Sequence, residues 1–538
     1  MDFPKESYCY QVAQNGWQLP ETYNMGQVAC DDWAVKTPDA TALILADENQ
    51  IISYKELRAL SNQLANLYTE LGLSRDDRVG ILLPQALETA IGHLAAFKCG
   101  LISVPLFMLF GPDALEHRVI DAGIKVIITN QQGANKLSEM KDEARDGLII
   151  LTIDGVHQGL GSLDFQAKLG AQSDVFECVQ TGPDDPAMII YTSGTTGSPK
   201  GALHGHRMLA GHMTGFETFN DFKTAPGRVI WTPADWAWIG GLFDVLIPAL
   251  ACGMSVVSKR FEKFTADAAF DLLADYNVQH AFLPPTALKL MRSTYPDNAP
   301  RELHLVSVGS GGESLGAPLL DWGKSVLSVT INEFYGQTEG NLLISSCAAL
   351  ETPRPGIIGK AVAGHEMAAI DMDGNAVPDG EIGIIAAKAP DAVMMLNYWN
   401  NPEATKEKFI GKWMLTGDMG VVEADGWIRF VGRDDDVITS AGYRIGPGSI
   451  EDCLMRHPSV KIAGVVGKPD ETRTEIVVAF VVLADGISPS DDLILELQTH
   501  VKTRLAAHEY PREIYVLDEL PVTTTGKVMR RKLRDMLV

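Results

Sequence analysis

The sequence predicts an α/β protein, with a large N-terminal domain of parallel sheets flanked by helices and a smaller α+β domain at the C-terminus. Two observations predict this class. Apolar, strand-like runs alternate with helix-like runs through most of the chain, and this βαβ rhythm is typical of parallel sheets covered by helices. Near residue 367 the pattern changes to short strands separated by turn residues, which predicts a β-rich subdomain before the last unit.

The first βαβ series begins at Arg78. The predicted order is strand, helix, strand, helix, strand: Arg78–Leu83, Leu87–Lys98, Leu101–Leu106, Ala114–Ala122 and Lys125–Thr129. The same rhythm predicts four later strands, at Val229–Pro233, Ser255–Ser258, His280–Leu283 and Leu303–Val308.

The β-rich stretch runs from Met367 to Phe430, with turn signals such as Asp425-Gly426. A domain boundary is predicted after Arg433, which gives domains of residues 1–433 and 434–538. The second domain is predicted to contain two helices and two strands, at Ser449–Arg456, Ile462–Val466, Ile476–Leu483 and Asp491–Leu505, before a basic tail.

Composition excludes several classes of function. The 538 residues are 46% hydrophobic, enough for a large core and more than one domain. The formal net charge of -24 would repel nucleic acid and anionic lipid, so any phosphate binding has to be local. The most apolar stretch, residues 79–110, is interrupted by polar and charged residues, so no membrane span is expected.

The cysteines indicate a reducing compartment. They are scattered and include no C-x-x-C pair: Cys9, Cys30, Cys99, Cys178, Cys252, Cys347 and Cys453. Residues 1–10 contain no long apolar run, so no signal peptide is expected and a cytoplasmic protein is predicted.

The sharpest local signal is a glycine- and hydroxyl-rich loop after the apolar strand Ala187–Tyr191. It contains Thr192, Ser193, Gly194, Thr195, Thr196, Gly197 and Lys200. Glycines let backbone N–H groups approach phosphate oxygens, hydroxyls add donors, and the lysine adds a point charge. The alternative, a flexible polar loop, is less favoured directly after a buried strand. A Walker A loop needs Gly immediately before Lys, but Pro199 precedes Lys200, so that interpretation fails.

This loop resembles the signature of the adenylate-forming (ANL) superfamily, which includes acyl- and aryl-CoA synthetases, peptide-synthetase adenylation domains and luciferases. Further motifs in family order extend the resemblance over roughly residues 25–538, and it is closest to acetyl- and medium-chain acyl-CoA synthetases. The resemblance implies ATP, Mg²⁺ and CoA as cofactors and co-substrates, and a C-terminal domain that is mobile.

The resemblance also implies a nucleotide site. Gly312, Glu313 and Ser314 would lie along the adenine, although Ser314 stands where Pro or Ala is common. A phosphopantetheine attachment site at this Gly-Gly-x-Ser is the weaker alternative. After the strand-like Val326–Ile331, Tyr335 would stack on adenine, Thr338 would donate to the α-phosphate, and Glu339 would hold Mg²⁺.

The remaining family roles lie nearer the C-terminus. Asp418, before a predicted hairpin, would accept from the ribose hydroxyls, or it is simply a turn residue, and Arg433 would contact ribose or phosphate. Asp435 would be the hinge, and Gly442 and Arg444 belong to the loop that serves thioester formation. Lys527 matches the adenylation lysine, whose charge offsets the repulsion between carboxylate and α-phosphate.

The acyl pocket is assigned by the same resemblance to Asp235, Trp238, Gly240 and Gly336. Gly336 replaces the tryptophan that closes the pocket in acetyl-CoA synthetases, so an acyl group larger than propionyl is expected: medium-chain, branched or aryl. Core packing is the alternative for Trp238. Asp235 could instead anchor an amino group, as in amino-acid-activating domains.

The sequence therefore predicts an AMP-forming acid–thiol ligase that makes an acyl-adenylate and passes the acyl group to CoA. CoA is preferred as acceptor because no carrier domain follows Val538. Two alternatives stay open: a stand-alone adenylation enzyme that loads a carrier protein, and a catalytically silent homologue that binds acyl groups or nucleotides. Arg118 could meet a CoA phosphate, but an exposed helix arginine is the simpler interpretation.

Overall fold

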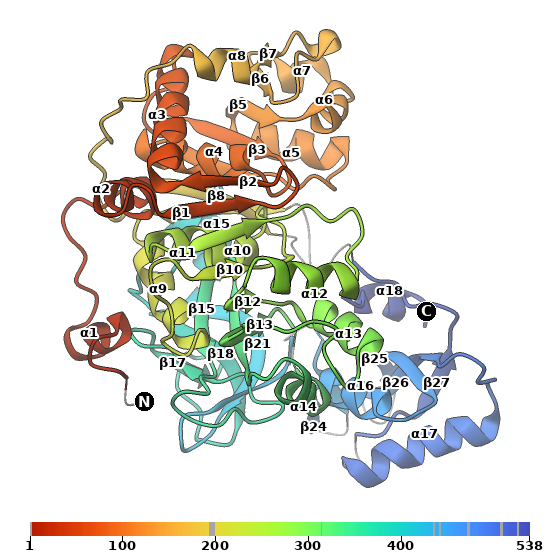
Figure 1. The fold of residues 1–538 in the computed structure, drawn as a ribbon. Coiled ribbons are helices and arrows are strands. Elements are labelled where there is room, and N and C mark those ends of the chain that lie inside the picture. Colours follow the sequence, from red (N-terminus) through yellow and green to blue (C-terminus); the bar gives the residue numbers. More distant parts are fainter. Residues whose placement is uncertain are drawn as a thin grey trace. The chain divides into compact units, whose positions relative to one another are not determined.

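A computed structural model describes residues 3–192, 199–313, 315–433, 436–440, 443–470, 474–505, 509–523 and 527–537. The chain forms two compact units (Figure 1). The first contains Met1–Pro355, Gly359–His365 and Ala389–Phe409, and the second contains Gly356–Ile358, Glu366–Lys388 and Ile410–Val538. The boundary predicted after Arg433 lies inside the second unit and stays a prediction.

A nine-stranded sheet forms half of the first unit, and its central strands are parallel. In spatial order the strands are β16 (Lys360–Ala361), β15 (Gly340–Ser345), β14 (Ile331–Gln337), β13 (Ser307–Gly311), β12 (His280–Phe282), β10 (Val229–Trp231), β11 (Ser255–Ser258), β1 (Thr41–Leu45) and β2 (Gln50–Ser53).

An eight-stranded sheet forms the other half, again parallel in its middle and antiparallel at β8, β9 and β19. Its order is β19 (Asn397–Tyr398), β9 (Lys200–Gly205), β8 (Pro186–Thr192), β4 (Ile102–Pro105), β3 (Arg78–Leu82), β5 (Ile124–Thr129), β6 (Ile149–Thr152) and β7 (Leu163–Asp164).

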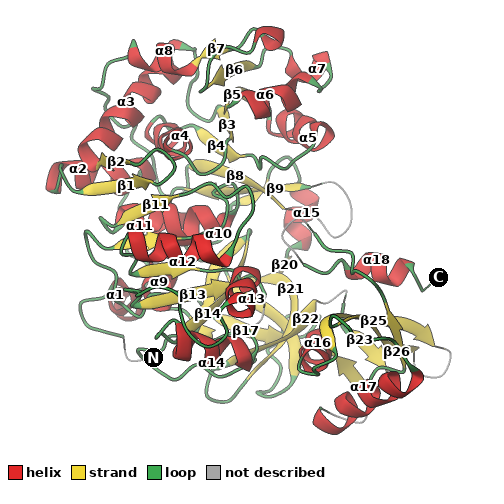
Figure 2. Ribbon diagram, turned by 45° about the vertical axis from the view of Figure 1, so that its right-hand side comes forward, coloured by secondary structure: helices red, strands yellow, loops and turns green. Residues whose placement is uncertain are grey.

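Helices cover both faces of these sheets (Figure 2). The helices of the first unit are α1 (Tyr8–Asn15), α2 (Asp32–Lys36), α3 (Tyr54–Glu70), α4 (Leu87–Lys98), α5 (Pro112–Ala122), α6 (Gln131–Ser138), α7 (Asp142–Arg145), α8 (Phe165–Gly170), α9 (Met208–Phe219), α10 (Ile239–Gly241), α11 (Ile247–Ala251), α12 (Ala266–Asp275), α13 (Pro285–Thr294), α14 (Ala317–Val326) and α15 (Pro402–Glu407). Local sequence explains their ends: Ser53 and Glu56 form a reciprocal capping box that starts α3, and Gly123 ends α5 in the left-handed conformation. Two π-helical turns, η1 (Gln27–Asp31) and η3 (Leu242–Leu246), and a short 3₁₀ turn, η2 (Gln158–Leu160), complete the unit.

The second unit contains two five-stranded sheets. One is built from β17 (Met367–Ile370), β18 (Ile382–Lys388), β20 (Phe409–Ile410), β21 (Trp413–Val422) and β22 (Ile428–Arg433). The other contains β23 (Ile438–Ser440), β24 (Tyr443–Ile445), β25 (Val460–Asp470), β26 (Thr474–Leu483) and β27 (Glu513–Val516), with helices α16 (Pro447–Met455), α17 (Asp491–Arg504) and α18 (Arg530–Asp535).

The α/β class is confirmed, and so is the βαβ series from β3 to β5. Two strand predictions are wrong in position. The strand expected at Leu303–Val308 begins only at Ser307, because Leu303 and Leu305 pack against the core from an irregular segment. The stretch Val326–Ile331 is not a strand: α14 ends at Val326 and β14 begins at Ile331.

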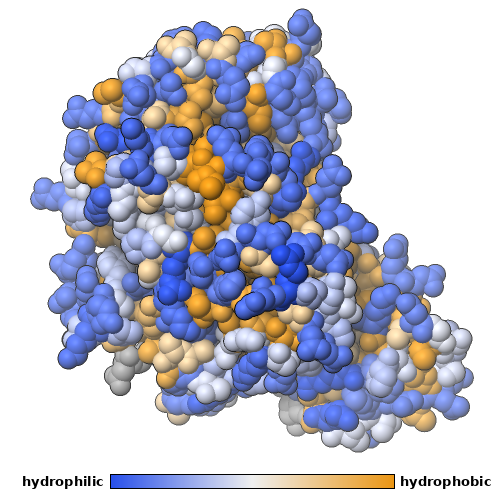
Figure 3. Space-filling model, in the orientation of Figure 1, coloured by the Kyte–Doolittle hydropathy of each residue, from blue (hydrophilic) through white to orange (hydrophobic). Residues whose placement is uncertain are grey.

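One face of the molecule shows how hydrophilic and hydrophobic residues are distributed on the surface. The face drawn in Figure 3 is mostly hydrophilic, with hydrophobic residues gathered in groups between the hydrophilic ones. Among the described residues, no helix is long and apolar enough to cross a lipid bilayer.

Candidate active site

The glycine-rich loop connects two antiparallel strands of the first unit. Thr192 ends β8, Lys200 begins β9, and the two residues pair directly. Thr192 Oγ1 also donates to the carbonyl oxygen of Lys200, at 3.4 Å. The hairpin therefore fixes both ends of the loop. The loop residues predicted to bind phosphate, Ser193, Gly194, Thr195, Thr196 and Gly197, lie outside the described residues.

The Tyr335–Glu339 motif lies at the end of β14 and in the turn to the antiparallel strand β15. His204, on β9, makes a 2.8 Å hydrogen bond with the carbonyl oxygen of Thr338. Burial lowers the pKa of His204 to about 4, so the ring is neutral and donates from Nε2 to this carbonyl. The neutral imidazole thus links the second motif to the strand that follows the glycine-rich loop.

Glu339 is 8% exposed and lies in a set of polar groups from different parts of the chain. One carboxylate oxygen, Oε1, accepts a short hydrogen bond from the Tyr398 hydroxyl, and Lys408 Nζ lies 3.8 Å from the same oxygen. Lys408 Nζ also donates to Gln337 Oε1 at 2.6 Å. Burial, and then the charge of Glu339, raise the pKa of Tyr398, which keeps its hydroxyl a donor.

Tyr398 also connects this carboxylate to the first motif. The ammonium of Lys200 lies 5.5 Å from the centre of the Tyr398 ring, a distance typical of a cation–π contact. The structure therefore brings together Lys200 and Glu339, which sequence analysis selected from separate motifs. Tyr398, Lys408 and His204 belong to none of the motifs, so the sequence alone did not predict their place in the site.

Glu339 fits the chemistry of a magnesium ligand. Its Oε2 atom makes no hydrogen bond within the described part of the chain, which leaves one hard oxygen for a cation. No group of three metal-binding side chains occurs among the described residues. Mg²⁺ is commonly held by one or two carboxylates together with phosphate oxygens and water, so a single carboxylate suits it.

The predicted adenine-binding residues are only partly described. Gly312 follows β13 with φ +95°, a conformation that favours glycine. Glu313 Oε2 lies 3.4 Å from Lys289 Nζ in a partly exposed ion pair. Tyr335 is half-buried on β14. Ser314 lies outside the described residues.

Of the residues assigned to the acyl pocket, Asp235, Trp238 and Gly240 lie in α10 or just before it, and Gly336 lies on β14. Asp235 Oδ1 accepts from the Ala237 N–H at 2.8 Å, and burial raises the pKa of Asp235 to about 6. Trp238 is half-buried and contacts two other aromatic rings, with centres 5.1 Å from Phe107 and 6.0 Å from Phe110. Trp236, in contrast, is fully buried core.

The two glycines of this set differ. A Cβ at Gly336 would come within 2.4 Å of the Leu342 nitrogen, so glycine is needed here for the close approach of β15. The expected open volume is therefore not on the Cβ side of Gly336. At Gly240 the atoms nearest to a Cβ would belong to Phe282, at 3.1 Å, and to Asp244 Oδ2, at 3.6 Å.

In the second unit, Asp418 and Arg433 face each other across β21 and β22. Arg433 Nε lies 3.3 Å from Asp418 Oδ1, with the carboxylate buried and the guanidinium partly exposed. Gly417, immediately before Asp418, has φ +80°, which a glycine adopts without strain. The sequence therefore places a carboxylate and a guanidinium side by side on one hairpin.

Lys527 is exposed, but its backbone is fixed. The Lys527 N–H donates to Thr523 Oγ1 at 3.1 Å, and the Lys527 carbonyl accepts from the Thr523 N–H at 2.7 Å. Arg444 belongs to β24. Asp435 and Gly442 lie outside the described residues.

The expectation that Arg118 is an exposed helix arginine is wrong. Arg118 is 4% exposed, and its guanidinium lies 3.9 Å from the centre of the Phe110 ring. Its Nη1 atom donates to the Ala114 carbonyl at 2.6 Å. Stacking and burial explain this arginine without a phosphate.

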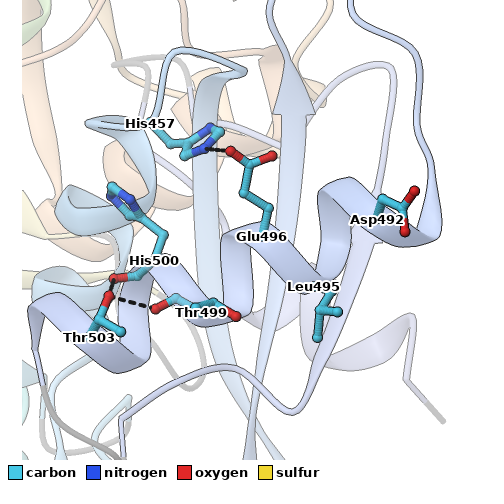
Figure 4. Close-up of a pocket in the computed structure, with 7 residues that line it drawn as sticks. All are labelled: His457, Asp492, Leu495, Glu496, Thr499, His500 and Thr503. Carbon is cyan, nitrogen blue, oxygen red and sulfur yellow. Dashed lines mark hydrogen bonds and ion pairs between the residues drawn. The ribbon is translucent and has the colours of Figure 1, made fainter.

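A pocket of about 430 Å³ lies on the second unit, away from all of these residues in the sequence (Figure 4). Its lining comes from α17 and from His457, which bonds Glu496 Oε1 at 3.2 Å: His457, Asp492, Leu495, Glu496, Thr499, His500 and Thr503. None of them belongs to a motif that predicts chemistry. We therefore place the candidate active site at the motif residues and not at this pocket.

Comparisons with known proteins identify the family of this chain. Residues 30–399 match the model of the AMP-binding enzyme family, and residues 449–527 match the AMP-binding enzyme C-terminal domain. Acyl-coenzyme A synthetase ACSM4, mitochondrial, of Rattus norvegicus is 33% identical over 96% of this chain and 91% of its own length. Acetyl-coenzyme A synthetase of Bacillus subtilis (strain 168) is 32% identical over 91% of this chain and 86% of its own.

A solved structure is similar as well. The anthranilate CoA ligase AuaEII in complex with anthranoyl-AMP has a TM-score of 0.86 and 28% identity, covering 96% of this chain and 98% of its own. The family resemblance read from the motifs is thereby confirmed: this chain belongs to the AMP-binding enzyme family of the adenylate-forming superfamily.

Proposed function

We propose that this protein is an AMP-forming acyl-CoA synthetase. A carboxylic acid attacks the α-phosphorus of ATP, which releases pyrophosphate and gives an acyl-adenylate. The thiol of CoA then attacks the acyl carbonyl, which releases AMP and gives the thioester. The similarity to named acyl-CoA and acetyl-CoA synthetases over most of the chain supports this reaction.

One structural observation carries the proposal. Lys200 and Glu339, 139 positions apart in the sequence, both contact Tyr398: Lys200 lies near its ring, and Glu339 accepts from its hydroxyl. A cation and a buried carboxylate with a free oxygen are the groups that a nucleotide with bound Mg²⁺ requires. In the proposed reaction Glu339 would hold Mg²⁺, which would supply positive charge to the phosphates. Lys200 would bind phosphate, and the Thr338 hydroxyl would donate to the α-phosphate.

The second unit supplies the remaining proposed roles. Asp418 accepts from ribose hydroxyls, Arg433 binds ribose or phosphate, and Lys527 offsets the repulsion between the two anions that react. The division into residues 1–433 and 434–538, with Asp435 as hinge, is part of the same proposal. Gly442 and Arg444 would serve the thioester step after rotation of the C-terminal domain.

The proposed acid carries an acyl group larger than propionyl. The similarity to ACSM4 is as high as the similarity to an acetyl-CoA synthetase, so identity alone does not decide acyl size. A cytoplasmic location is likewise a proposal, supported by seven free cysteines, while the ACSM4 relative is described as mitochondrial.

The test is an acid panel assayed for release of AMP and pyrophosphate with ATP and Mg²⁺, with and without CoA. The expected result is AMP release that needs both a medium-chain, branched or aryl acid and CoA. Pyrophosphate release with no consumption of CoA would favour the adenylation enzyme that serves a carrier protein. Nucleotide binding without turnover of any acid would favour the silent homologue.

A further inference from the structure

Three buried polar side chains lie next to the residues assigned to the acyl pocket. Asp244 is on the π-helical turn η3, Asn341 on β15 and His212 on α9. Their exposed fractions are 2%, 4% and 0%. Polar groups this deeply buried need hydrogen-bond partners, so a partner can be sought for each of their donor and acceptor atoms.

The hydrogen-bond directions follow from His212. Its Nδ1 atom lies 2.7 Å from the Met208 carbonyl oxygen, which can only accept. Burial lowers the pKa of His212 to about 3, so the ring is neutral and Nε2 accepts. Asn341 Nδ2 lies 3.2 Å from this Nε2 and therefore donates to it, and its second N–H makes a short hydrogen bond to Asp244 Oδ1.

Within this trio of Asp244, Asn341 and His212, two side-chain oxygen atoms have no hydrogen-bond partner among the described residues. Among the described residues, neither Asp244 Oδ2 nor Asn341 Oδ1 makes a hydrogen bond. Asp244 Oδ2 lies 3.6 Å from the place a Cβ would take on Gly240, and Asn341 Oδ1 lies 2.6 Å from the corresponding place on Gly336. Both glycines are half-buried and both are assigned to the acyl pocket.

The two remaining atoms have opposite hydrogen-bonding character. Burial raises the pKa of Asp244 well above its usual value, which favours the neutral form of its carboxyl group. Because Oδ1 accepts from Asn341, the proton sits on Oδ2, which becomes a donor. Asn341 Oδ1 is an acceptor. The trio thus offers one donor near Gly240 and one acceptor near Gly336.

We propose that Asp244 and Asn341 select carboxylic acids that carry a hydroxyl group on the acyl chain. A hydroxyl accepts from one group and donates to another, which matches the pair of free atoms. The Phe282 ring lies beside Gly240, and the centre of the Phe334 ring lies 5.1 Å from the centre of the Phe282 ring. Both rings would pack against the hydrocarbon part of the acyl chain. The inference rests on the proposed function and names the substrate class for that site.

A second buried trio in the same unit, Asn220, Ser307 and His280, uses both ends of its amide in hydrogen bonds and serves as a comparison. Asn220 uses both ends of its amide: Nδ2 donates to the Phe216 carbonyl at 3.0 Å, and Oδ1 contacts Ser307 Oγ at 2.8 Å and His280 Nδ1 at 3.0 Å. The amide oxygen of Asn341 has no such partner among the described residues. Ser307→Ala is therefore a matched control for loss of a buried polar group.

The test compares kcat/KM for pairs of acids that share one skeleton and differ by a single hydroxyl, placed at successive positions along the chain. For the wild-type protein, at least one hydroxy acid is expected to exceed its parent by about 10- to 100-fold, because an unsubstituted acid leaves the buried pair unsatisfied. Asp244→Leu is expected to abolish this preference or to reverse it, and Asp244→Asn to keep part of it. Ser307→Ala should leave the ratio unchanged.

Each result bears on the inference. If every parent acid reacts as well as its hydroxy partners, or if Asp244→Leu keeps the wild-type ratio, the inference is overturned while the proposed function stands. If Asp244→Leu does not fold, Asn341→Ala replaces it, since loss of the acceptor should also reduce the ratio. If no acid at all gives AMP and a thioester, it is the proposed function that fails.

Discussion

The two units of this chain differ in how far their proposed catalytic charged groups are buried and held by other side chains. In the first unit, Glu339 is almost buried and is held by Tyr398 and Lys408. In the second unit, Lys527 is exposed, and only its backbone is fixed. A site whose dipoles are already oriented binds and stabilises charge without reorganisation, whereas a solvated cation has to be brought to its partner. This difference agrees with the proposal that the first unit supplies a prepared binding site and that Lys527 of the second unit supplies a cation that is brought to it.

The largest expected difference between the units is their response to acid. Burial lowers the pKa of five histidines of the first unit to values of about 3 or 4: His93, His204, His206, His212 and His280. Above pH 6.5 these rings are neutral in both the folded and unfolded states. Below it only the unfolded chain takes up the protons, so the free energy of unfolding falls by about 1.4 kcal/mol per ring and pH unit until the folded pKa is reached.

Carboxyl groups oppose this effect but are fewer. Burial raises the pKa of Asp235 to about 6 and also raises the pKa of Asp244, Glu88 and Glu217, so these four groups bind protons in the folded state first, which favours folding as the pH falls. Hydrogen exchange at pH 7 and pH 5, corrected for the intrinsic rates, should therefore show protection lost mainly in the first unit. Equal loss of protection in both units would contradict the comparison.

Lys527→Ala tests the mobile charge. Adenylate formation should fall by about 10³-fold, because the cation that stabilises the charge in the transition state is lost. Thioester formation from supplied acyl-adenylate should stay within about threefold of wild type, because in that step the thiol attacks an acyl carbonyl and no carboxylate has to approach a phosphate. Single-turnover assays of the two half-reactions measure both. Lys532→Ala, the same change on the neighbouring helix α18, is the control, and equal loss of both half-reactions would refute the assignment.

Glu339→Gln tests the prepared site. The substitution keeps the shape and an acceptor for Tyr398 but removes the charge that holds Mg²⁺, so kcat/KM should drop by about 10²-fold. The Mg²⁺ concentration that gives half-maximal rate should rise as well. Glu116→Gln, which breaks an exposed pair with Lys141, should leave both values unchanged. An unaltered Mg²⁺ dependence would remove Glu339 from the metal site.

Tyr398→Phe is expected to have the smallest effect. It deletes the hydroxyl that orients Glu339 but keeps the ring near Lys200. Loss of one hydrogen bond to a charged group corresponds to about 1.5–3 kcal/mol, or roughly a tenfold to hundredfold loss of kcat/KM, and we expect the lower end because Lys408 remains. Tyr515→Phe removes an exposed hydroxyl that bonds Glu513 Oε2 at 2.7 Å and serves as the control. Identical kinetics for Tyr398→Phe and wild type would show that Glu339 is oriented without the tyrosine.

Local sequence was sufficient for the elements that carry the motifs. The turn signal Asp425-Gly426 predicts the hairpin of β21 and β22, on which Asp418 and Arg433 pair. The apolar run before the glycine-rich loop predicts β8. These features depend on residues close in sequence, where turn chemistry and periodicity act.

The partners of those motifs were not predictable in this way. Tyr398 reaches Glu339 from 59 positions away, and Asn341 meets Asp244 across 97 positions. No local pattern marks such residues, because only the order of strands in the sheets brings them together. The same limit explains Gly336, whose missing side chain is required by its neighbour on β15 rather than by an open volume.

The pairing of β21 with β22 has a further consequence. Side chains alternate between the two faces of a strand, so Asp418 and Arg433 share a face only in the observed register. Inserting one residue into the Asp425-Gly426 turn without an accompanying bulge would slide one strand past the other and turn these two side chains to opposite faces. A register shift of one residue would therefore separate Asp418 from Arg433 even though both strands would still form.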